Sequence, residues 1–441
     1  MQTTPTQLVE RFVRPARLTG SVAVPGDKSL SHRALLFAAL ATGPSELQGL
    51  SGGEDVVGTA RALQQLGVDL DLGAGRCVVH GRGPASWRSP QGPIDCGNSG
   101  TTMRLLCGLL ASLPGIQATL TGDPSLQRRP MARVTLPLVA MGAHITAADG
   151  RAPLQIVGQH LQGQPHHLPV ASAQLKTALL LAGLHASGQT EVYEPIQSRD
   201  HTERMLSALG APLVPLDGGW AIAAGTIRPL GTWQAPGDPS SAAFVVVAGV
   251  LHPNAQVAVP TVCVNPTRIG WVDVLARMGA AVSASDNEES AGEPIATLHA
   301  RSSTLVATAI EPAEVPALID ELPILALCAA AASGTSVWRG IAELRVKESD
   351  RLAAIVRLLT LLGVTTRHGP DWLEIDGLGS LQAVAALRAP FAPGLDHRMA
   401  MTAAVAGLCG PHPLQVSGME AVASSWPGFV AALAQISRTD L

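Results

Sequence analysis

The sequence predicts an α/β protein assembled from repeated βα-type units. A phrase made of the end of an amphipathic helix, a glycine and a strand of alternating apolar residues occurs five times along the chain. Glycine suits the left-handed residue that commonly ends a helix, and the alternation is typical of a half-buried strand. Because 441 residues exceed one typical hydrophobic core, we expect two large domains or several small units.

The five copies are spaced by about 70 to 85 residues, which is too long for a solenoid repeat. Residues 429–436 resemble a truncated sixth copy. This regularity favours internal duplication of a unit in which a helix packs on a sheet, although helix, glycine and strand also follow one another in α/β proteins without repeats. The glycines of the five copies are Gly67, Gly142, Gly210, Gly279 and Gly363.

Composition excludes several functional classes. The chain is apolar, with 46% hydrophobic and 15% charged residues, yet its longest apolar runs, 242–251 and 324–332, are too short to span a bilayer and are expected to be buried. The net charge of −4 and the 13 aromatic residues argue against a nucleic-acid surface of basic patches and stacking rings. Residues 1–17 contain no long apolar stretch, so we expect no secretory signal and a cytoplasmic location.

The six cysteines show no C-x-x-C spacing and stand mostly among apolar residues. This pattern is typical of buried free thiols in a reducing compartment and indicates neither a disulfide framework nor a zinc site. They are Cys77, Cys96, Cys107, Cys263, Cys328 and Cys409.

The most informative motif is residues 25–33 (PGDKSLSHR), which runs directly into the apolar stretch 34–40. A Pro-Gly turn followed by Asp and Ser predicts a helix that starts near residue 29. The first turn of such a helix has unpaired N–H groups and the positive end of the helix dipole. Lys28 and Arg33 add two cations there, which is unfavourable unless an anion lies between them. The motif therefore predicts a phosphate or carboxylate site.

Two other interpretations of this motif stay open at this point. It could be an ordinary capped helix with two solvated charges. An ATP-binding P-loop fits less well, because Asp27 separates the glycine from the lysine and the upstream glycine-rich loop is missing.

Three further segments combine polar or basic residues with an expected helix start. Residues 98–102 (NSGTT) precede an apolar helix and offer more N-terminal amides to an anion. Residues 127–130 (QRRP) place two guanidinium groups before a helix, with proline at its favoured first position. Residues 396–398 (DHR) precede the apolar stretch 399–409.

A fourth segment, residues 345–352 (RVKESDRL), is expected to open another helix. Lys347 and Arg351 would then lie four residues apart on one face, which costs stability unless an anion lies between them. Pairing of Glu348 with Arg351 would relieve part of that repulsion. So many basic helix starts in a chain with so little charge indicate a heavily anionic pair of ligands.

Together these motifs resemble the 3-phosphoshikimate 1-carboxyvinyltransferase (EPSP synthase) family of aromatic amino-acid biosynthesis, and in particular its divergent bacterial, class II-like branch. The resemblance covers nearly the whole chain in the right order. It rests on residues 25–33, 97–101, 129–130, 172–174, 198–203, 320–321, 345–351 and 396–398.

The resemblance implies a two-domain inside-out α/β barrel of six βαβαββ repeats, three in each domain. Residues 1–24 with 239–441 would form one domain and residues 25–238 the other, with the active site in the cleft between them. The resemblance also implies two small-molecule substrates and a monomeric enzyme, with no metal, organic cofactor, nucleic acid or membrane as a partner.

The reaction that the resemblance implies is transfer of the enolpyruvyl group of phosphoenolpyruvate to the 5-hydroxyl of shikimate 3-phosphate. Asp320 would accept the hydroxyl proton, while Glu348 and Lys28 would manage protons at the methylene carbon and the leaving phosphate. The residues that would hold shikimate 3-phosphate are Lys28, Ser29, Arg33, Ser172, Ala173, Gln174, Ser198, Arg199, Asp320 and Lys347. Those that would hold phosphoenolpyruvate are Lys28, Gly100, Arg129, Gln174, Arg351 and Arg398.

This chain departs from the family pattern at two places. Many members have a lysine just before a Thr-Phe-Pro near the C-terminus, but Ser424 stands there in residues 423–427 (ASSWP), so that contact to phosphoenolpyruvate is absent or replaced. Ser172-Ala173-Gln174 replaces the Ser-Ser-Gln of other members, as in the divergent branch. In this family the residue at the position of Gly100 lies against the phosphoenolpyruvate pocket, where glyphosate also binds. Some tolerant members have alanine there, whereas this chain has glycine, so we expect it to be a glyphosate target.

Two alternative functions remain at this point. The sister enolpyruvyltransferase that acts on UDP-N-acetylglucosamine uses a loop cysteine, and none of the six cysteines here stands in a polar, arginine-containing loop. A non-catalytic relative that binds phosphorylated metabolites would be favoured by loss of Asp320, Lys347 or Glu348, and all three are present.

Overall fold

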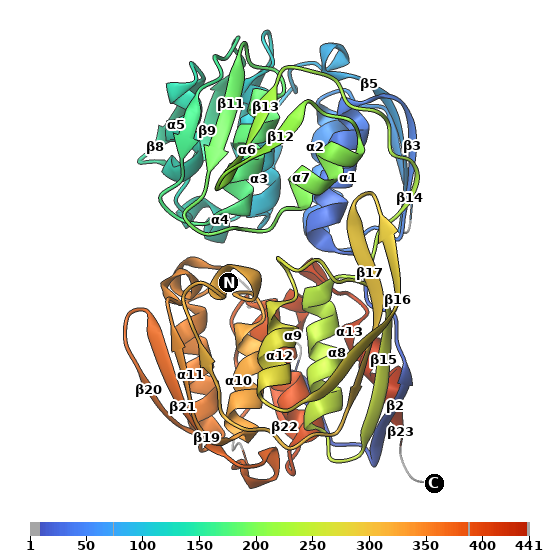
Figure 1. Ribbon diagram of the computed structural model, residues 1–441, viewed down its shortest axis with the longest axis vertical. Helices are drawn as coiled ribbons and strands as arrows, with labels where there is room; N and C mark the ends of the chain where they lie inside the picture. The colour runs from blue at the N-terminus through green and yellow to red at the C-terminus, as the bar shows by residue number, and fades with distance from the viewer. Residues whose placement is uncertain (1–8, 74, 387–388, 439–441) are drawn as a thin grey trace, which may run out of the picture. The chain divides into compact units, whose positions relative to one another are not determined.

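The computed structural model describes residues 9–73, 75–386 and 389–438 (Figure 1). The chain forms two compact units. The terminal unit contains the chain up to Pro25, Gly237–Glu288 and the chain from Pro294 onward. The inserted unit contains Gly26–Pro236 and the short segment Glu289–Glu293.

In the described part of the inserted unit, three four-stranded sheets share one arrangement, in which the first two strands are parallel and the next two pairings are antiparallel. The first sheet has the order β14 (Gly231–Gln234), β3 (Thr42–Gln48), β5 (Arg76–Arg82), β4 (Leu70–Gly73). The second has the order β6 (Ile94–Asp95), β7 (Gln117–Thr121), β9 (Arg151–Val157), β8 (His144–Ala148). The third has the order β10 (Pro165–His167), β11 (Gln189–Tyr193), β13 (Gly219–Ala223), β12 (Leu213–Leu216).

Each sheet of the inserted unit covers one central helix that is buried along nearly its whole length, so the helices lie inside and the sheets outside (Figure 1). The central helices are α1 (Lys28–Leu40), α3 (Gly100–Ala111) and α6 (Ala173–Gly183). The other helices are α2 (Glu54–Gln65), α4 (Pro124–Arg128), α5 (Ala132–Ala140), α7 (His201–Ala208) and the short 3-10 helix η1 (Pro84–Ser86).

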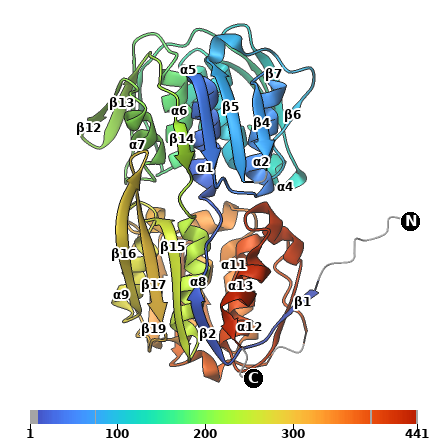
Figure 2. The same ribbon diagram turned by 90° about the vertical axis from the view of Figure 1, so that its right-hand side faces the viewer.

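The terminal unit repeats this plan. One sheet has the order β18 (Ala309–Ile310), β19 (Ser333–Arg339), β21 (Trp372–Leu378), β20 (Thr365–His368). A second has the order β16 (Ala281–Ser290), β17 (Glu293–Arg301), β15 (Ala255–Cys263), β2 (Arg17–Ser21), β23 (Ser437–Arg438), and Figure 2 shows β2 beside β15. Among the described residues the third set is the pair β1 (Val9–Phe12) and β22 (Leu414–Ser417), with a parallel bridge between Phe391 and Val416.

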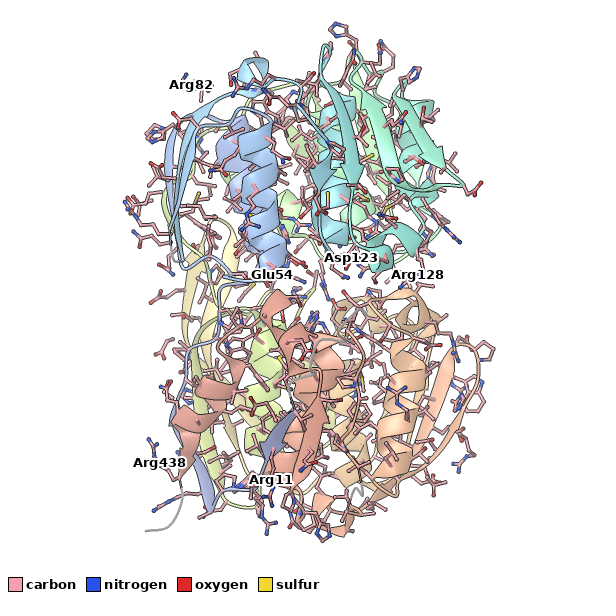
Figure 3. The ribbon with its side chains drawn as sticks, turned by 180° about the vertical axis from the view of Figure 1, so that it is seen from behind. Arg11, Glu54, Arg82, Asp123, Arg128 and Arg438 are labelled. Carbon is pink, nitrogen blue, oxygen red and sulfur yellow. The ribbon has the colours of Figure 1, made fainter. Side chains whose placement is uncertain are left out.

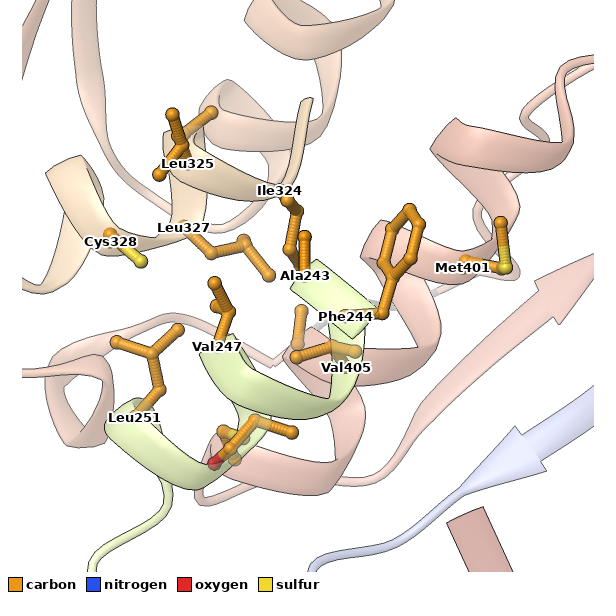
Figure 4. Packing of buried hydrophobic residues seen from close by; sticks show 14 of the residues in the cluster. Ala243, Phe244, Val247, Leu251, Ile324, Leu325, Leu327, Cys328, Met401 and Val405 are labelled. Carbon is orange, nitrogen blue, oxygen red and sulfur yellow. The ribbon is translucent and has the colours of Figure 1, made fainter. Parts of the chain in front are cut away.

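The core of the terminal unit lies between its three central helices. Ala243, Phe244 and Val247 of α8 meet residues of α10 and α12 such as Ile324 and Val405 (Figure 4). The central helices are α8 (Pro239–Leu251), α10 (Leu322–Ala331) and α12 (His397–Cys409). The other helices are α9 (Gly270–Arg277), α11 (Arg351–Leu361) and α13 (Phe429–Ile436), with the 3-10 helices η2 (Val315–Ala317), η3 (Ala342–Val346), η4 (Leu381–Ala383) and η5 (Met419–Ser424).

The predicted repeat is confirmed. Each of its five glycines follows an outer helix and precedes a strand. Their φ angles lie between 80° and 100°, a backbone conformation that residues with a Cβ rarely adopt. The truncated sixth copy is α13, which continues into β23 without a glycine. The predicted burial of 242–251 and 324–332 is also confirmed: the first stretch lies within α8, and the second lies in α10 and its C-cap Ala332. Among the described residues, no helix is both long and apolar enough to cross a membrane.

The close approach of α3 and α6 requires glycine at position 108. A Cβ at Gly108 would lie 2.2 Å from the carbonyl oxygen of Ala178. We expect Gly108→Ala to lower the free energy of unfolding by about 1–3 kcal/mol, because the two central helices must separate. Gly58 in α2 is the matched control, since a Cβ there meets nothing within 4 Å, and Gly58→Ala should raise stability by about 0.5–1 kcal/mol. Urea unfolding followed by circular dichroism measures both, and equal stabilities of the two variants would contradict this packing.

Candidate active site

The first turns of the three central helices of the inserted unit meet at one end. His32 Nδ1 of α1 lies 2.7 Å from Thr59 Oγ1, which lies 2.7 Å from Thr102 Oγ1 of α3. Gln174 Nε2 of α6 donates to Thr101 Oγ1 at 2.8 Å. Burial lowers the pKa of His32 to about 3, so this imidazole is neutral at physiological pH. Helix N-termini brought together in this way concentrate unpaired amides and positive dipole ends in one place.

The predicted anion cradle begins with a capped helix, as expected. Helix α1 starts at Lys28, and Asp27 Oδ1 accepts from the backbone N–H of Leu30 at 2.7 Å. The ammonium of Lys28 lies 3.0 Å from Asp55 Oδ2, and the Lys28 side chain is only 19% exposed. Lys28 is therefore held by a carboxylate rather than freely solvated.

Arg33 is buried and joins α1 to two other helices. Its Nε donates to Thr202 Oγ1 at 2.8 Å, its Nη2 to Thr177 Oγ1 at 2.9 Å and its Nη1 to the carbonyl of Ser29 at 2.9 Å. Burial lowers the pKa of Arg33 to about 10, with a smaller contribution in the same direction from the nearby charge of Arg199. The guanidinium stays charged at neutral pH, and at most two of its five N–H donors remain for a ligand.

Two guanidinium groups flank Gly100 at the start of α3. Ser99 caps this helix by accepting from the N–H of Thr102 at 3.1 Å. A Cβ at Gly100 would lie 2.6 Å from Nη1 of Arg104 and 3.2 Å from Nη1 of Arg129. Sequence reasoning did not single out Arg104, whose only signal is its position one turn after Gly100.

Both guanidinium groups beside Gly100 are held by side-chain oxygens. Arg104 Nη1 donates to Gln174 Oε1 at 2.5 Å, and Arg129 Nη2 donates to Asn98 Oδ1 at 2.6 Å. The predicted residues Gly100, Arg129 and Gln174 are therefore brought together within this unit.

A helix follows residues 127–130, as expected, but it starts later than expected: α5 begins at Ala132. Asp123 caps the short helix α4, which begins at Pro124 and ends at Arg128, and Figure 3 labels both Asp123 and Arg128. Pro130 precedes Met131, the N-cap of α5, and so does not occupy a first helical position. Arg129 is instead the C-cap of α4. This helix starts earlier than Pro130 suggests, because Asp123 is a good N-cap and Pro124 takes the favoured first position.

Ser172 and Ser198 lie on two segments that one carboxylate joins. Ser172 caps α6, of which Ala173 is the first residue, and its N–H donates to Glu194 Oε1 at 3.1 Å. The N–H of Ser198 donates to Glu194 Oε2 at 3.2 Å. The Ser198 hydroxyl is buried and has no hydrogen-bond partner among the described residues, and a buried polar group of this kind is costly unless a ligand or water satisfies it.

In the terminal unit the first turns of α8, α10 and α12 also meet. Ser240 Oγ of α8 donates to Glu321 Oε1, directly before α10. Arg398 Nη1 of α12 lies 3.5 Å from the same carboxylate oxygen. The predicted residues Asp320 and Arg398 therefore stand at one helical end of this unit.

Asp320 is surrounded by three predicted cationic residues. Its Oδ1 lies 3.1 Å from Arg351 Nη1 and 3.7 Å from Lys347 Nζ, while its Oδ2 lies 3.9 Å from Arg398 Nη2. Arg398 Nη1 also donates to the Asp320 carbonyl at 3.1 Å. Three cations therefore lie close to this one carboxylate.

Arg351 is buried among three carboxylates. Glu348 Oε2 contacts its Nη2, and Asp396 Oδ2 accepts from its Nε at 2.9 Å. Burial alone lowers the pKa of Arg351, but the charges of Asp396, Glu348 and Asp320 outweigh it and hold this pKa above its usual value. Asp396 also accepts from the hydroxyl of Ser349 at 2.8 Å and caps α12.

The expectation that Lys347 and Arg351 share one helix face is wrong. Asp350 caps α11, which begins at Arg351, whereas Lys347 is the C-cap of the 3-10 helix η3. Both cations instead contact the carboxylate of Asp320, which is distant from them in sequence. The expected pairing of Glu348 with Arg351 is confirmed.

Ser424, which stands where many family members have lysine, lies at the end of η5. Its hydroxyl donates to the carbonyl of Ala421 at 2.8 Å and lies 3.3 Å from Nδ1 of His397, the first residue of α12. The substitution thus leaves a small polar group beside the start of this central helix.

Comparison with known proteins assigns the family. The family model of EPSP synthase (3-phosphoshikimate 1-carboxyvinyltransferase) matches residues 13–433. The chain belongs to the EPSP synthase family. The 3-phosphoshikimate 1-carboxyvinyltransferase of Roseiflexus castenholzii is 44% identical over 97% of this chain and 100% of the relative, and that of Gloeobacter violaceus is 46% identical over 96% and 98%.

Solved structures agree with this assignment. The EPSP synthase of Acinetobacter baumannii is 38% identical and superposes with a TM-score of 0.87 over 98% of this chain and 99% of that one. The enolpyruvyl transferase NikO from Streptomyces tendae, at 17% identity and a TM-score of 0.76 over 98% and 97%, shares the fold. The predicted two-domain inside-out α/β fold of βαβαββ repeats is confirmed.

The buried Asp396 carboxylate gives a stability prediction. Asp396→Asn leaves Arg351 without its innermost partner, so we expect a loss of about 3–5 kcal/mol in the free energy of unfolding at pH 7. Although burial by itself raises the pKa of Asp396, Arg351 outweighs it and lowers this pKa. The Asp396 contribution is therefore full above about pH 4, the ordinary value in the unfolded chain, and is lost as pH falls through the lower folded pKa.

Urea unfolding of the wild type and Asp396→Asn between pH 7 and pH 3 measures this difference, which should shrink below about pH 4. Asp376→Asn is the control, because Asp376 also pairs with an arginine, Arg367, but at an exposed position, where a pair contributes little. Equal losses in the two variants, or a difference independent of pH, would contradict the assignment.

Proposed function

We propose that the chain transfers the enolpyruvyl group of phosphoenolpyruvate to the 5-hydroxyl of shikimate 3-phosphate, releasing phosphate. The observation that carries the proposal is the cluster of Lys347, Arg351 and Arg398 around Asp320, with Glu348 bound to Arg351. It combines two carboxylates able to carry protons with cations that are fixed in place for a phosphate and a carboxylate. Membership of the EPSP synthase family supports the same reaction.

The two substrates are assigned to the residues whose motifs match the family. Shikimate 3-phosphate is held by Lys28, Ser29, Arg33, Ser172, Ala173, Gln174, Ser198, Arg199, Asp320 and Lys347. Phosphoenolpyruvate is held by Lys28, Gly100, Arg129, Gln174, Arg351 and Arg398.

The reaction proceeds by addition and then elimination. The oxygen of the 5-hydroxyl attacks C2 of phosphoenolpyruvate while Asp320 accepts the hydroxyl proton. The methylene carbon receives a proton, which Glu348 supplies with Lys28 close by. The resulting tetrahedral intermediate then loses a proton from the new methyl group. The bond between C2 and the phosphate oxygen breaks, which gives the enol ether and free phosphate.

Fixed charges supply the stabilisation that this chemistry needs. Cations at helix N-termini, held in advance by carboxylates, cost no reorganisation when negative charge moves to the leaving phosphate. We therefore assign no metal or organic cofactor, and we propose a monomeric enzyme of the cytoplasm.

The alternative that acts on UDP-N-acetylglucosamine is not favoured. It would use a reactive cysteine in a polar loop, but all six cysteines here are buried. Burial raises the pKa of the Cys96 and Cys107 thiols to about 12, so both are protonated and unreactive at neutral pH.

An assay with the purified chain tests the proposal. Incubation with shikimate 3-phosphate and phosphoenolpyruvate should release phosphate and form equimolar 5-enolpyruvylshikimate 3-phosphate, identified by mass spectrometry. Neither substrate alone should release phosphate. Turnover of phosphoenolpyruvate with UDP-N-acetylglucosamine instead, or binding of both substrates without turnover, would reject the proposal.

Two substitutions separate chemistry from binding. Glu348→Gln should lower kcat by roughly two to four orders of magnitude, because the amide keeps the shape of the side chain but carries no proton. Arg129→Ala should raise KM for phosphoenolpyruvate by about ten- to a hundredfold, because it removes charge-assisted hydrogen bonds. Steady-state kinetics with each substrate varied measures both effects. Near-normal kcat in Glu348→Gln would refute the role given to this residue.

Gly100 governs the response to glyphosate. We expect glyphosate to inhibit the wild type competitively with phosphoenolpyruvate. Gly100→Ala should give tolerance with some loss of affinity for phosphoenolpyruvate, since the methyl group would press on Arg104 and Arg129 at 2.6 and 3.2 Å. Inhibition constants of both forms test this, and equal sensitivity would show that the glycine does not control the pocket.

A further inference from the structure

One buried cation of the inserted unit has no part in the reaction as proposed. Lys176 lies in α6 with its side chain only 1% exposed, and its Nζ is 2.6 Å from Glu194 Oε2 and 2.6 Å from Glu203 Oε1. Burial alone lowers the pKa of Lys176, but the two carboxylates outweigh it and raise this pKa. Lys176 is therefore a permanent cation, and buried charges of this kind are stable only when paired.

Glu194 uses both of its oxygens on the backbone of two separate segments. Oε1 accepts from the N–H of Ser172 and Oε2 from the N–H of Ser198, at 3.1 and 3.2 Å. The same Oε2 receives the ammonium of Lys176. The segment before α6 and the segment before α7 are thus fixed to one carboxylate, which is fixed in turn by one lysine.

The contacts close a ring through the first turn of α6. The N–H of Lys176 donates to the carbonyl of Ser172 at 2.9 Å, so Lys176 and Ser172 are joined both along the helix and through Glu194. A closed ring of hydrogen bonds leaves its members little freedom. It also sets the place of the buried Ser198 hydroxyl, which has no partner among the described residues.

We propose that Glu194 and Lys176 are positioning residues for shikimate 3-phosphate, an inference that rests on the function proposed above. Glu194 does not bind the substrate, because a carboxylate would repel a phosphate and its side chain is only 6% exposed. Its role is to hold Ser172 and Ser198 at the spacing that the substrate needs. Lys176 balances the charge of the Glu194 carboxylate, so that Glu194 can lie near the phosphate of the substrate.

Glu203 distinguishes this role from ordinary stabilisation. It pairs with the same lysine at the same distance and is as deeply buried, with its side chain 1% exposed. No backbone group of the Ser172 or Ser198 segment bonds to it in the described structure. A substitution at Glu203 therefore removes a buried carboxylate without releasing either segment.

The kinetic test compares Glu194→Gln with Glu203→Gln. Glutamine has one accepting oxygen, so Glu194→Gln keeps at most one of the two backbone bonds. We expect KM for shikimate 3-phosphate to rise by about ten- to a hundredfold in Glu194→Gln, with kcat and KM for phosphoenolpyruvate within about threefold of the wild type. Glu203→Gln should leave all three constants within about threefold.

Glu194→Asp provides a conservative variant in case the glutamine enzyme does not fold. It keeps the charge facing Lys176 but withdraws the carboxylate by one methylene, so KM for shikimate 3-phosphate should rise by a smaller factor. An unchanged KM in every Glu194 variant that folds, or an equal rise in Glu203→Gln, would overturn the proposal.

Hydrogen–deuterium exchange gives a readout that needs no turnover. Peptides covering 168–176 and 194–200 should exchange faster in Glu194→Gln than in the wild type and in Glu203→Gln, because the Ser172 and Ser198 amides lose an acceptor. Equal exchange in all three would overturn the proposal. If the wild type does not turn over the two substrates, the proposed function fails, and the exchange comparison alone decides whether Glu194 holds the two segments.

Discussion

Pairing of buried cations with carboxylates at the helix N-termini is the constraint on which the rest of the structure depends. The central helices are apolar nearly all round, so a charge at their ends is stable only beside its partner. Asp320 and Asp396 hold Arg351 in the terminal unit, and Asp55 holds Lys28 in the inserted unit. The positive groups are therefore in place before any ligand arrives.

The duplicated unit explains why these charges gather. Each βαβαββ copy buries one central helix under a sheet, and bonds between first turns show that the helices of each unit meet at their N-terminal ends. The sequence predicted this plan well, because helix starts and stops depend on local rules: Asp27 before α1, Ser99 before α3, Asp396 before α12. Two helix starts were predicted at the wrong residue because another aspartate in the same segment is the N-cap. Asp123 and Asp350 start α4 and α11 at points that the basic residues around them did not suggest.

The partners of the site residues could not be predicted in this way. Lys28 pairs with Asp55 and Arg351 with Asp396, and these bonds join residues 27 and 45 positions apart. Such contacts are set by how the helices pack rather than by neighbouring residues. Sequence reasoning therefore missed Asp55, Arg104, the pairing of Asp396 with Arg351 and the Lys176–Glu194 pair. Motif resemblance located the chemistry, whereas only the packed structure shows what holds each charged group in position.

The proposed chemistry depends on which bond of phosphoenolpyruvate breaks. Fixed cations that accept charge on a leaving phosphate favour cleavage between C2 and the bridging oxygen, whereas transfer of the phosphoryl group would break the bond between that oxygen and phosphorus. Phosphoenolpyruvate labelled with ¹⁸O at the bridging position separates the two in one turnover with shikimate 3-phosphate. We predict that the label leaves with inorganic phosphate and that the enol ether contains none of it. Label retained in pyruvate or in the organic product would contradict the account.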